Sequence, residues 1–388
     1  MNYNKILKKL TCFNDIYSIT KSLTEKQKGD LFEWFTYYTF KYDPRLNIGL
    51  EEIWMYSEIP NHILEILHLP SKDKGIDLLI KKNNQYYAIQ CKFRENITKT
   101  ISWQELSTFY GLSFGMTDSI VGGYLVTNTL YFCKEVLNSN KVITINGQFF
   151  QDYFQPIITN KIIYKGKSKY AHQQICIDLT NQHFENNDRG FIEMACGAGK
   201  TLSAYWIAEN YNKIVVFVPS LQLLSQIFTS WVIESHANNK KFDYLLIGTN
   251  ANVDDKIKSF NPSGLNLTTD INTINQFLQK DKIIVICTYQ SSNLLSMCQR
   301  EIYDTCNIPF DLGVFDEAHK TVQSKDTLFT SMLSDDNMYI KKRLFMTATP
   351  KNYKKYKEDE EDNIISMDNE KIYGKCIYSY NIGSAIQR

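Results

Sequence analysis

The chain has 388 residues, a length that favours two ordinary domains, and its 43% hydrophobic content is sufficient for packed cores. Its 43 basic and 42 acidic residues nearly balance, which excludes bulk basicity as the source of any nucleic-acid contact and leaves local patches. Nine cysteines occur singly, with no C-x-x-C pair and no histidine spacing typical of zinc, which favours a reducing, cytoplasmic compartment. No stretch resembles a signal peptide, and no apolar run approaches the ~18 residues of a membrane span, so we expect neither secretion nor membrane insertion.

The N-terminal residues, 1–155, are expected to form an α/β domain. Residues 23–41 have helical periodicity, with apolar side chains on one stripe at Leu31, Phe32, Phe35 and Tyr38. Two alternating runs, 76–80 and 86–93, are predicted to be strands around a polar turn. Two further strands with a helix between them are predicted at 120–127, 131–138 (the helix) and 141–145.

A Lys-rich connection, 156–170, is expected to link this domain to a second one, 171–388. The second domain contains short apolar runs separated by longer helical or loop stretches, a pattern typical of buried parallel strands with crossover helices. These runs are 190–194, 214–218, 243–247, 282–287, 312–315 and 342–346. Residues 354–363 are rich in charge and are predicted to be a solvated loop. The Lys-rich segments Lys161–Lys169 and Lys351–Lys357 are either phosphate contacts or ordinary solvated surface.

The first candidate site is a Gly-rich turn that follows the run 190–194. In a phosphate-binding loop, the backbone N–H groups of such a turn open onto a helix N-terminus and hold the phosphates. Here the turn would be formed by Gly197, Ala198 and Gly199. Lys200 would reach the β- and γ-phosphates, and the hydroxyl of Thr201 would ligate Mg²⁺.

A second motif favours the nucleotide interpretation. The full G-x-x-x-x-G-K-T pattern is not met, because Met194 occupies the first Gly position, and Gly-Lys-Thr alone also occurs in ordinary turns. However, the buried run 312–315 would deliver Asp316 and Glu317 at the carboxyl end of a strand, where α/β sheets bind ligands. Asp316 suits a Mg²⁺ contact through water, and Glu317 suits polarising the attacking water; the alternative is a charged strand end without a role.

These residues resemble the motifs of superfamily 2 helicases of the DEAH type. Residues 194–201, Met-Ala-Cys-Gly-Ala-Gly-Lys-Thr, look like motif I, residues 316–319, Asp-Glu-Ala-His, match motif II, and residues 347–349, Thr-Ala-Thr, match motif III. The resemblance implies a RecA-like lobe that binds ATP and Mg²⁺, with His319 part of the nucleotide site. It also implies that Gln173 recognises adenine, although Tyr170 replaces the usual nearby Arg.

The same resemblance implies contacts to the backbone of one nucleic-acid strand. Residues 216–220 resemble motif Ia and residues 287–291 a later strand-end loop, so the implied contacts are Pro219, Ser220, Thr288, Thr347 and Thr349. The family hydrolyses ATP between two RecA-like lobes, and residues 349–388 are too few for a second lobe. We therefore expect poor hydrolysis unless a second lobe or a partner chain completes the site. Residues 367–386 resemble the segment that leads into that lobe in Type ISP-like restriction enzymes.

The second candidate site is the N-terminal hairpin. If Asn83 and Asn84 form a two-residue turn, Asp77 lies directly across from Gln90, with both side chains on one face. Lys92 shares that face, because side chains alternate along a strand. Asp77 and Gln90 would then bind one Mg²⁺, and Lys92 would counter charge on a scissile phosphate. A surface hairpin with one charged face is the alternative.

This hairpin resembles the Mrr-type restriction endonuclease fold of the PD-(D/E)-x-K class, whose Mrr branch carries Q-x-K. The matching residues are Phe32-Glu33, Lys74 to Asp77, Ala88 to Lys92 and the strand 122–127. The resemblance implies a catalytic set of Asp77, Gln90 and Lys92, with Glu33 as a helix carboxylate near the metal. Gln90 in place of an acidic residue removes one metal-binding charge.

We therefore expect an α/β protein in which a restriction-endonuclease-like domain precedes one RecA-like P-loop domain with a mainly parallel sheet. The expected function is ATP- and Mg²⁺-dependent movement on duplex DNA, tracking one strand, with cleavage of DNA. Two alternatives stay open: a non-catalytic DNA-binding and nucleotide-sensing module, and an RNA helicase fragment with a degenerate nuclease fold. Cleavage of plasmid distinguishes the first alternative, and RNA-stimulated ATP turnover distinguishes the second.

Overall fold

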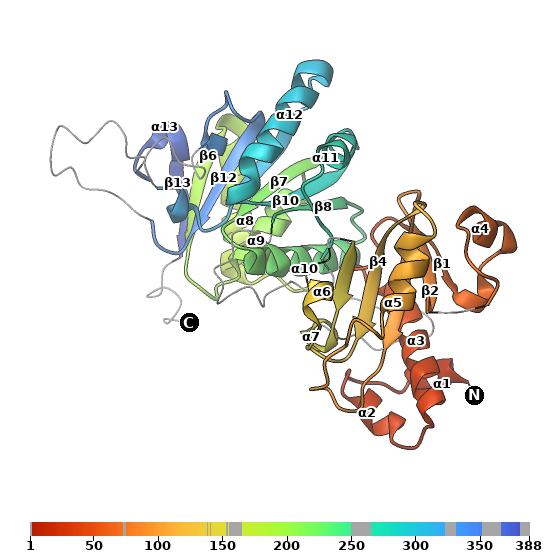
Figure 1. Cartoon of the computed structure of the whole chain (residues 1–388). Coiled ribbons are helices and arrows are strands. Elements are labelled where there is room, and N and C mark those ends of the chain that lie inside the picture. The colour runs from red at the N-terminus through yellow and green to blue at the C-terminus, as the bar shows by residue number, and fades with distance from the viewer. Residues whose placement is uncertain are drawn as a thin grey trace. The chain divides into compact units, whose positions relative to one another are not determined.

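The computed structural model describes residues 2–72, 75–137, 139, 141–152, 154, 165–249, 265–322, 331–350 and 366–380. The chain forms two compact units, the first comprising residues 1–164 and 261–266 and the second comprising residues 165–260 and 267–388 (Figure 1). Of the expected connection, 156–170, only 165–170 are described. The expected loop 354–363 lies outside the described residues, and so do Lys74, Lys351–Lys357 and the first four residues, 161–164, of the segment Lys161–Lys169. No helix in the described ranges is long and apolar enough to cross a membrane.

The first unit is a five-stranded mixed sheet in the order β1-β2-β3-β4-β5. Its strands are β1 (Leu50–Met55), β2 (Leu78–Lys82), β3 (Gln85–Lys92), β4 (Ile120–Thr127) and β5 (Val142–Ile145). Its helices are α1 (Tyr3–Leu7), α2 (Asp15–Thr20), α3 (Glu25–Tyr42), α4 (Asn61–Ile66), α5 (Ser107–Tyr110), α6 (Lys134–Leu137) and α7 (Gly147–Asp152). The first three strands are antiparallel, and β3, β4 and β5 run parallel.

The hairpin between β2 and β3 has the predicted register. Asn83 and Asn84 have φ angles of 50° and 61°, the left-handed pair that a two-residue type I′ turn requires. Lys82 pairs with Gln85, and the ladder continues to Leu78 opposite Ile89. The observed ladder ends at that pair, and beyond it the N–H of Asp77 bonds the carbonyl oxygen of Ile89, so the predicted pairing of residue 77 with residue 90 stays a prediction.

Two apolar cores cover the two faces of this sheet. Helix α3 begins at a capping box, in which the Thr24 side chain and the Gln27 side chain each bond the other's backbone N–H. Its apolar stripe, including Phe32 and Phe35, packs against one face of the sheet with side chains from α1 and α2. Residues of α4 and α5 cover the opposite face. The sheet is therefore a rigid platform, buried on both sides, for the side chains at its ends.

The second unit is an eight-stranded, entirely parallel sheet among the described residues, in the order β13-β6-β12-β11-β7-β10-β8-β9. Its strands are β6 (Arg189–Met194), β7 (Lys213–Val218), β8 (Asp243–Ile247), β9 (Leu267–Thr268), β10 (Ile283–Thr288), β11 (Phe310–Phe315), β12 (Ile340–Thr347) and β13 (Lys375–Tyr380). Its helices are α8 (Ala171–Asn186), α9 (Lys200–Ala208), α10 (Leu221–Ala237), α11 (Ile271–Leu278), α12 (Ser292–Cys306) and α13 (Glu370–Tyr373). The predicted α/β class with a mainly parallel sheet is confirmed.

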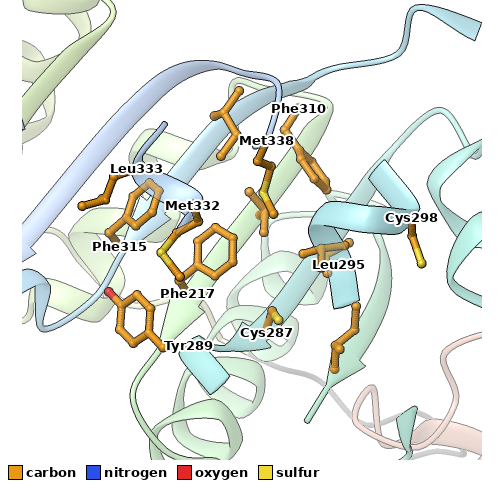
Figure 2. Packing of buried hydrophobic residues seen from close by; sticks show 14 of the residues in the cluster. Phe217, Cys287, Tyr289, Leu295, Cys298, Phe310, Phe315, Met332, Leu333 and Met338 are labelled. Carbon is orange, nitrogen blue, oxygen red and sulfur yellow. The ribbon is translucent and has the colours of Figure 1, made fainter. Parts of the chain in front are cut away.

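Helices cover both faces of this sheet. Helices α8, α9 and α10 pack together on one face, and α11 and α12 lie on the other (Figure 1). Figure 2 shows the buried cluster under α12, where the ring of Phe217 lies between Phe315 and Tyr289, at centroid distances of 5.1 and 6.2 Å. Burying each such side chain contributes about 1.5–3 kcal/mol. Because all strands are parallel, their carboxyl ends meet at one edge, where ligands bind in such sheets.

Candidate functional site

The Gly-rich turn joins the end of β6 to the start of α9. Gly197 and Gly199 have φ angles of 81° and 87°, a conformation that only glycine adopts without strain. Gly199 is the N-terminal cap of α9, so the first N–H groups of that helix face the turn. A Cβ atom at Gly199 would lie 2.2 Å from Nε2 of Gln173, which leaves no room for a side chain. The residues 195–199, here called the phosphate loop, therefore have the predicted geometry of an anion site.

Lys200 lies between this loop and the acidic end of β11. Its Nζ donates a hydrogen bond to the carbonyl oxygen of Met194 at 3.2 Å and lies 3.9 Å from Oε1 of Glu317. Glu317 follows directly after Asp316, and its backbone is left-handed, with φ of 50°. Strands β6 and β11, which are separated by β12 in the sheet, thus bring the lysine and the two acids together, as the motifs predicted.

The carboxyl group of Asp316 is strongly perturbed. Only 9% of the residue is exposed, and burial raises its pKa to about 6, with the charge of Glu317 acting in the same direction. The charge of Lys200 acts in the opposite direction. The charge of Lys320 also lowers this pKa, so two carboxylates face two lysine charges, and the raised value reflects the burial of Asp316 next to Glu317.

The acidic pair is connected to the end of β12. Nδ1 of His319 lies 3.4 Å from Oε2 of Glu317 and 3.0 Å from Oγ1 of Thr347. Thr347 is completely buried, and its hydroxyl oxygen also accepts the backbone N–H of Thr349 at 3.1 Å. Motifs II and III are thus joined by a hydrogen-bonded chain through one histidine.

The residues that could contact a nucleic-acid strand differ in exposure. Thr349 is exposed, and Ser220 is half-buried with its hydroxyl oxygen accepting the N–H of Leu223 at the start of α10. Pro219 and Thr288 are buried, like Thr347. Buried residues would act by shaping their loops, so their assignment as contacts stays a prediction.

Sequence reasoning did not identify Tyr289 as part of this edge. Its hydroxyl group donates a hydrogen bond to the carbonyl oxygen of Asp316 at 2.8 Å, while the Asp316 N–H is bonded to Phe217 at 2.9 Å. Tyr289 directly follows Thr288, so one buried ring connects the strand-end loop of β10 to the acidic pair. Its place inside the segment 287–291, which resembles a strand-end loop, was the available sequence signal.

Gln173 is buried beneath the phosphate loop, with 2% of its surface exposed. Its Oε1 accepts the backbone N–H of Tyr170 at 2.9 Å, and its Nε2 donates to the carbonyl of Gly199 at 3.4 Å. Both ends of the amide therefore contact protein. Recognition of adenine by this residue stays a prediction.

The nuclease candidates meet on the hairpin of the first unit. The N–H of Asp77 bonds the Ile89 carbonyl at 2.9 Å, and its Oδ2 accepts the N–H of Cys91 at 2.5 Å. These bonds hold Asp77 against the strand that carries Gln90 and Lys92. Gln90 is 3% exposed, and its Oε1 has no hydrogen-bond partner in the described part of the chain.

Glu33 approaches the same place from helix α3. The pKa of the Cys91 thiol is raised well above its usual value by burial and by the charges of Asp77 and Glu33, with Lys92 opposing. Both carboxylates and the lysine therefore lie within electrostatic reach of one atom. Within the described residues, no three His, Cys, Asp or Glu side chains form a metal cluster. A divalent cation would accordingly need the amide oxygen of Gln90, and a buried oxygen without a partner among the described residues fits that role.

Two family models match the chain. Residues 166–352 match the family described as Type III restriction enzyme, res subunit, and residues 41–170 match the family described as Restriction endonuclease. Probable helicases from two isolates of African swine fever virus are 28% and 30% identical over 220 residues, which is 56% of this chain. The chain spans 22% of the length of these relatives. The solved structure of the Type ISP restriction–modification enzyme LlaBIII bound to DNA matches with a TM-score of 0.74 and 24% identity, over 98% of this chain and 25% of that one.

Proposed function

We propose that this chain, which joins an Mrr-like restriction endonuclease domain to a helicase-type ATPase domain, cleaves DNA in a reaction linked to ATP-driven movement along the duplex. The observation that carries the proposal is that the chain contains two separate sites, one in each unit. Lys200 lies 3.9 Å from Glu317 at a phosphate loop in one unit. Asp77 is held against the strand bearing Gln90 and Lys92 in the other.

In the ATPase domain, the phosphate loop and Lys200 bind the triphosphate, because backbone N–H groups and an ammonium are the donors that phosphates require. Thr201 and Asp316 would hold the Mg²⁺ of the nucleotide. Glu317 orients the attacking water as its general base, and His319 holds that carboxylate in place. Turnover requires a second RecA-like lobe, which supplies the arginine that stabilises the transition state.

In the nuclease domain, Asp77 and Gln90 would hold Mg²⁺ on the hairpin face. When bound there, Mg²⁺ polarises the scissile phosphate and lowers the pKa of a water nucleophile. Lys92 places a positive charge beside the phosphate, where negative charge develops in the transition state. Glu33 adds negative charge from α3 and keeps the site favourable for a divalent cation.

Duplex DNA is the proposed substrate, because LlaBIII was solved bound to DNA and its fold extends over both units. The viral relatives are probable helicases, which supports ATP-driven movement on a nucleic acid. The rival functions are a DNA-binding, nucleotide-sensing module without cleavage and an RNA helicase fragment. The first predicts binding of ATP and DNA without cutting, and the second predicts ATP turnover stimulated by RNA.

Cleavage tests the nuclease half. Purified chain is incubated with supercoiled plasmid and Mg²⁺, and nicked and linear products are counted. Asp77→Ala and Lys92→Ala should each lower the cleavage rate at least about a hundredfold. Lys99→Ala removes an exposed lysine of the same unit and should cut like the wild type. If neither the wild type nor any variant cuts the plasmid, the result would favour the DNA-binding, nucleotide-sensing module.

Nucleotide binding tests the ATPase half. Affinity for a fluorescent ATP analogue is measured by titration with Mg²⁺. Lys200→Ala should weaken binding at least about a hundredfold, because it removes charge-assisted contacts to two phosphates. Glu317→Gln should bind normally, and any turnover restored by an added second lobe should be lost. Lys240→Ala, an exposed lysine of the same unit, is the control. Unchanged affinity in the Lys200 variant contradicts the assignment of the loop.

A further inference from the structure

Three aromatic rings form a parallel stack beside the phosphate loop. The ring of His172, in the first turn of α8, lies 4.4 Å from the ring of Tyr380 at the end of β13, with 6° between their planes. The ring of Tyr170, two residues earlier, lies 5.8 Å from the ring of His172 with 8° between their planes. The imidazole is therefore stacked on the ring of Tyr380, which comes from a strand far away in the chain.

Two residues of this stack, His172 and Tyr380, also bond the phosphate loop, at Ala198 and at Ala195. Nε2 of His172 lies 2.9 Å from the carbonyl oxygen of Ala198, and because a carbonyl can only accept, Nε2 carries the proton and donates. At the other end, the N–H of Ala195 donates to the carbonyl oxygen of Tyr380 at 2.9 Å. Strand β13 is fixed next to this point, where the hydroxyl of Ser379 bonds Glu193 at 2.8 Å.

Such attachment has a physical consequence for binding. The loop contains Gly197 and Gly199, which lose more conformational freedom on ordering than any other residue. A loop that must be ordered by its ligand binds that ligand less tightly than a loop ordered beforehand. The bonds at Ala195 and Ala198 fix the loop on either side of Gly197, and the stack fixes the imidazole that makes one of them.

We propose that His172, supported by Tyr380, is a positioning residue that holds the phosphate loop in its binding conformation. Nucleotide affinity then depends on the placement of strand β13 beside β6. The proposal rests on the nucleotide-binding function proposed above. It assigns His172 to the loop backbone and not to the base, so its removal weakens the binding of every nucleoside triphosphate by the same factor.

The test uses the full chain and two variants. His172→Phe keeps a flat ring in the stack but loses the donor, and Tyr380→Ala loses the supporting ring but keeps the carbonyl that Ala195 needs. Dissociation constants for fluorescent ATP and GTP analogues are measured with Mg²⁺. Each variant should raise both constants about three- to tenfold, the range expected for one net hydrogen bond or one ring pair. Both changes act through one imidazole. The dissociation constants of the double variant should therefore rise by less than the product of the increases in the two single variants.

A matched control lies on the same helix. Nε2 of His183 contacts the carbonyl oxygen of Arg189 at 2.8 Å, at the end of α8 that lies away from the phosphate loop. His183→Phe therefore removes a histidine–backbone bond of the same kind, and its affinity for both nucleotides should equal that of the wild type. Thermal melting of all variants checks that the fold is intact.

Hydrogen exchange gives a readout that does not require nucleotide. In the free protein, amides of residues 195–199 should exchange several-fold faster in His172→Phe and Tyr380→Ala than in the wild type or His183→Phe. Unchanged exchange and unchanged affinity would overturn the proposal, and so would a change in the ATP-to-GTP ratio alone, which would indicate base recognition. If the wild type binds no nucleotide, the proposed function fails, while loop exchange still decides whether His172 holds the loop.

Discussion

Replacing Asp316 by asparagine should stabilise the second unit at neutral pH, although it removes a carboxylate of the proposed nucleotide site. Burial, with the charge of Glu317, raises the pKa of the folded carboxyl from 3.8 to about 6. The folded state therefore binds this proton more tightly than the unfolded chain, and the associated stability is present below about pH 4 and lost as the pH rises through 6. A shift of about two units at about 1.4 kcal/mol each amounts to about 3 kcal/mol. Asparagine keeps the shape without the buried charge.

Thermal unfolding measured with a chelator and without nucleotide tests this reasoning. At pH 7.5, Asp316→Asn should melt about 6–12 °C above the wild type, and the difference should shrink toward pH 4.5. Asp311→Asn, on the same strand, is the control, and its expected change in stability has the opposite sign. Burial raises the pKa of Asp311, but hydrogen bonds from Lys341 and from the backbone of Lys213 lower it below its usual value. The Asp311→Asn variant should therefore be less stable than the wild type at pH 7.5. An Asp316→Asn protein that melts at or below the wild-type temperature at pH 7.5 would refute the argument.

Three further substitutions test the two sites. Gly199→Ala forces a side chain at positive φ against Gln173, at a cost of about 1–2 kcal/mol. It should weaken ATP binding about tenfold in a fluorescence titration, and normal affinity would contradict the role given to the loop. Gln90→Glu supplies the missing carboxylate and should tighten Mg²⁺ binding several-fold by calorimetry, whereas unchanged binding would remove Gln90 from the metal site. Tyr289→Phe leaves the Asp316 carbonyl without its buried hydrogen-bond donor. The unfolding free energy should fall by about 1–2 kcal/mol and the melting temperature by about 2–8 °C. An unchanged melting curve would show that this bond is unimportant.

Much of this architecture could be predicted because burial leaves a local signature. The runs 120–127 and 243–247 have the observed bounds of β4 and β8, since both strands are largely apolar and are bounded by polar turns. The hairpin register followed from Asn83-Asn84, because a two-residue turn fixes every pair in the ladder. The two resemblances agree with the family matches over residues 41–170 and 166–352, and the LlaBIII structure shares the fold.

The remaining features could not be predicted because they depend on contacts between distant segments. Strand β13 has a half-exposed, mixed polar and aromatic pattern, and only its pairing with β6 makes it a strand. Strand β1, Leu-Glu-Glu-Ile-Trp-Met, has two exposed acids in succession and lacks a clear alternation. The His-Gln pair at 172–173 was visible as a motif, but its bonds to Ala198 and Gly199 require the loop to be folded against α8.

The place of β6 in the sheet has a consequence for how the protein is made on the ribosome. Strand β6 is an interior strand, and one of its neighbours, β13, is the last described strand to emerge during translation. Until residues 375–380 leave the exit tunnel, one side of β6 is an unpaired edge that invites association with other nascent chains. The N–H of Ala195 also lacks its acceptor, the carbonyl oxygen of Tyr380, until that strand has been synthesised. Chaperone protection is therefore needed mainly in the interval between synthesis of the two strands.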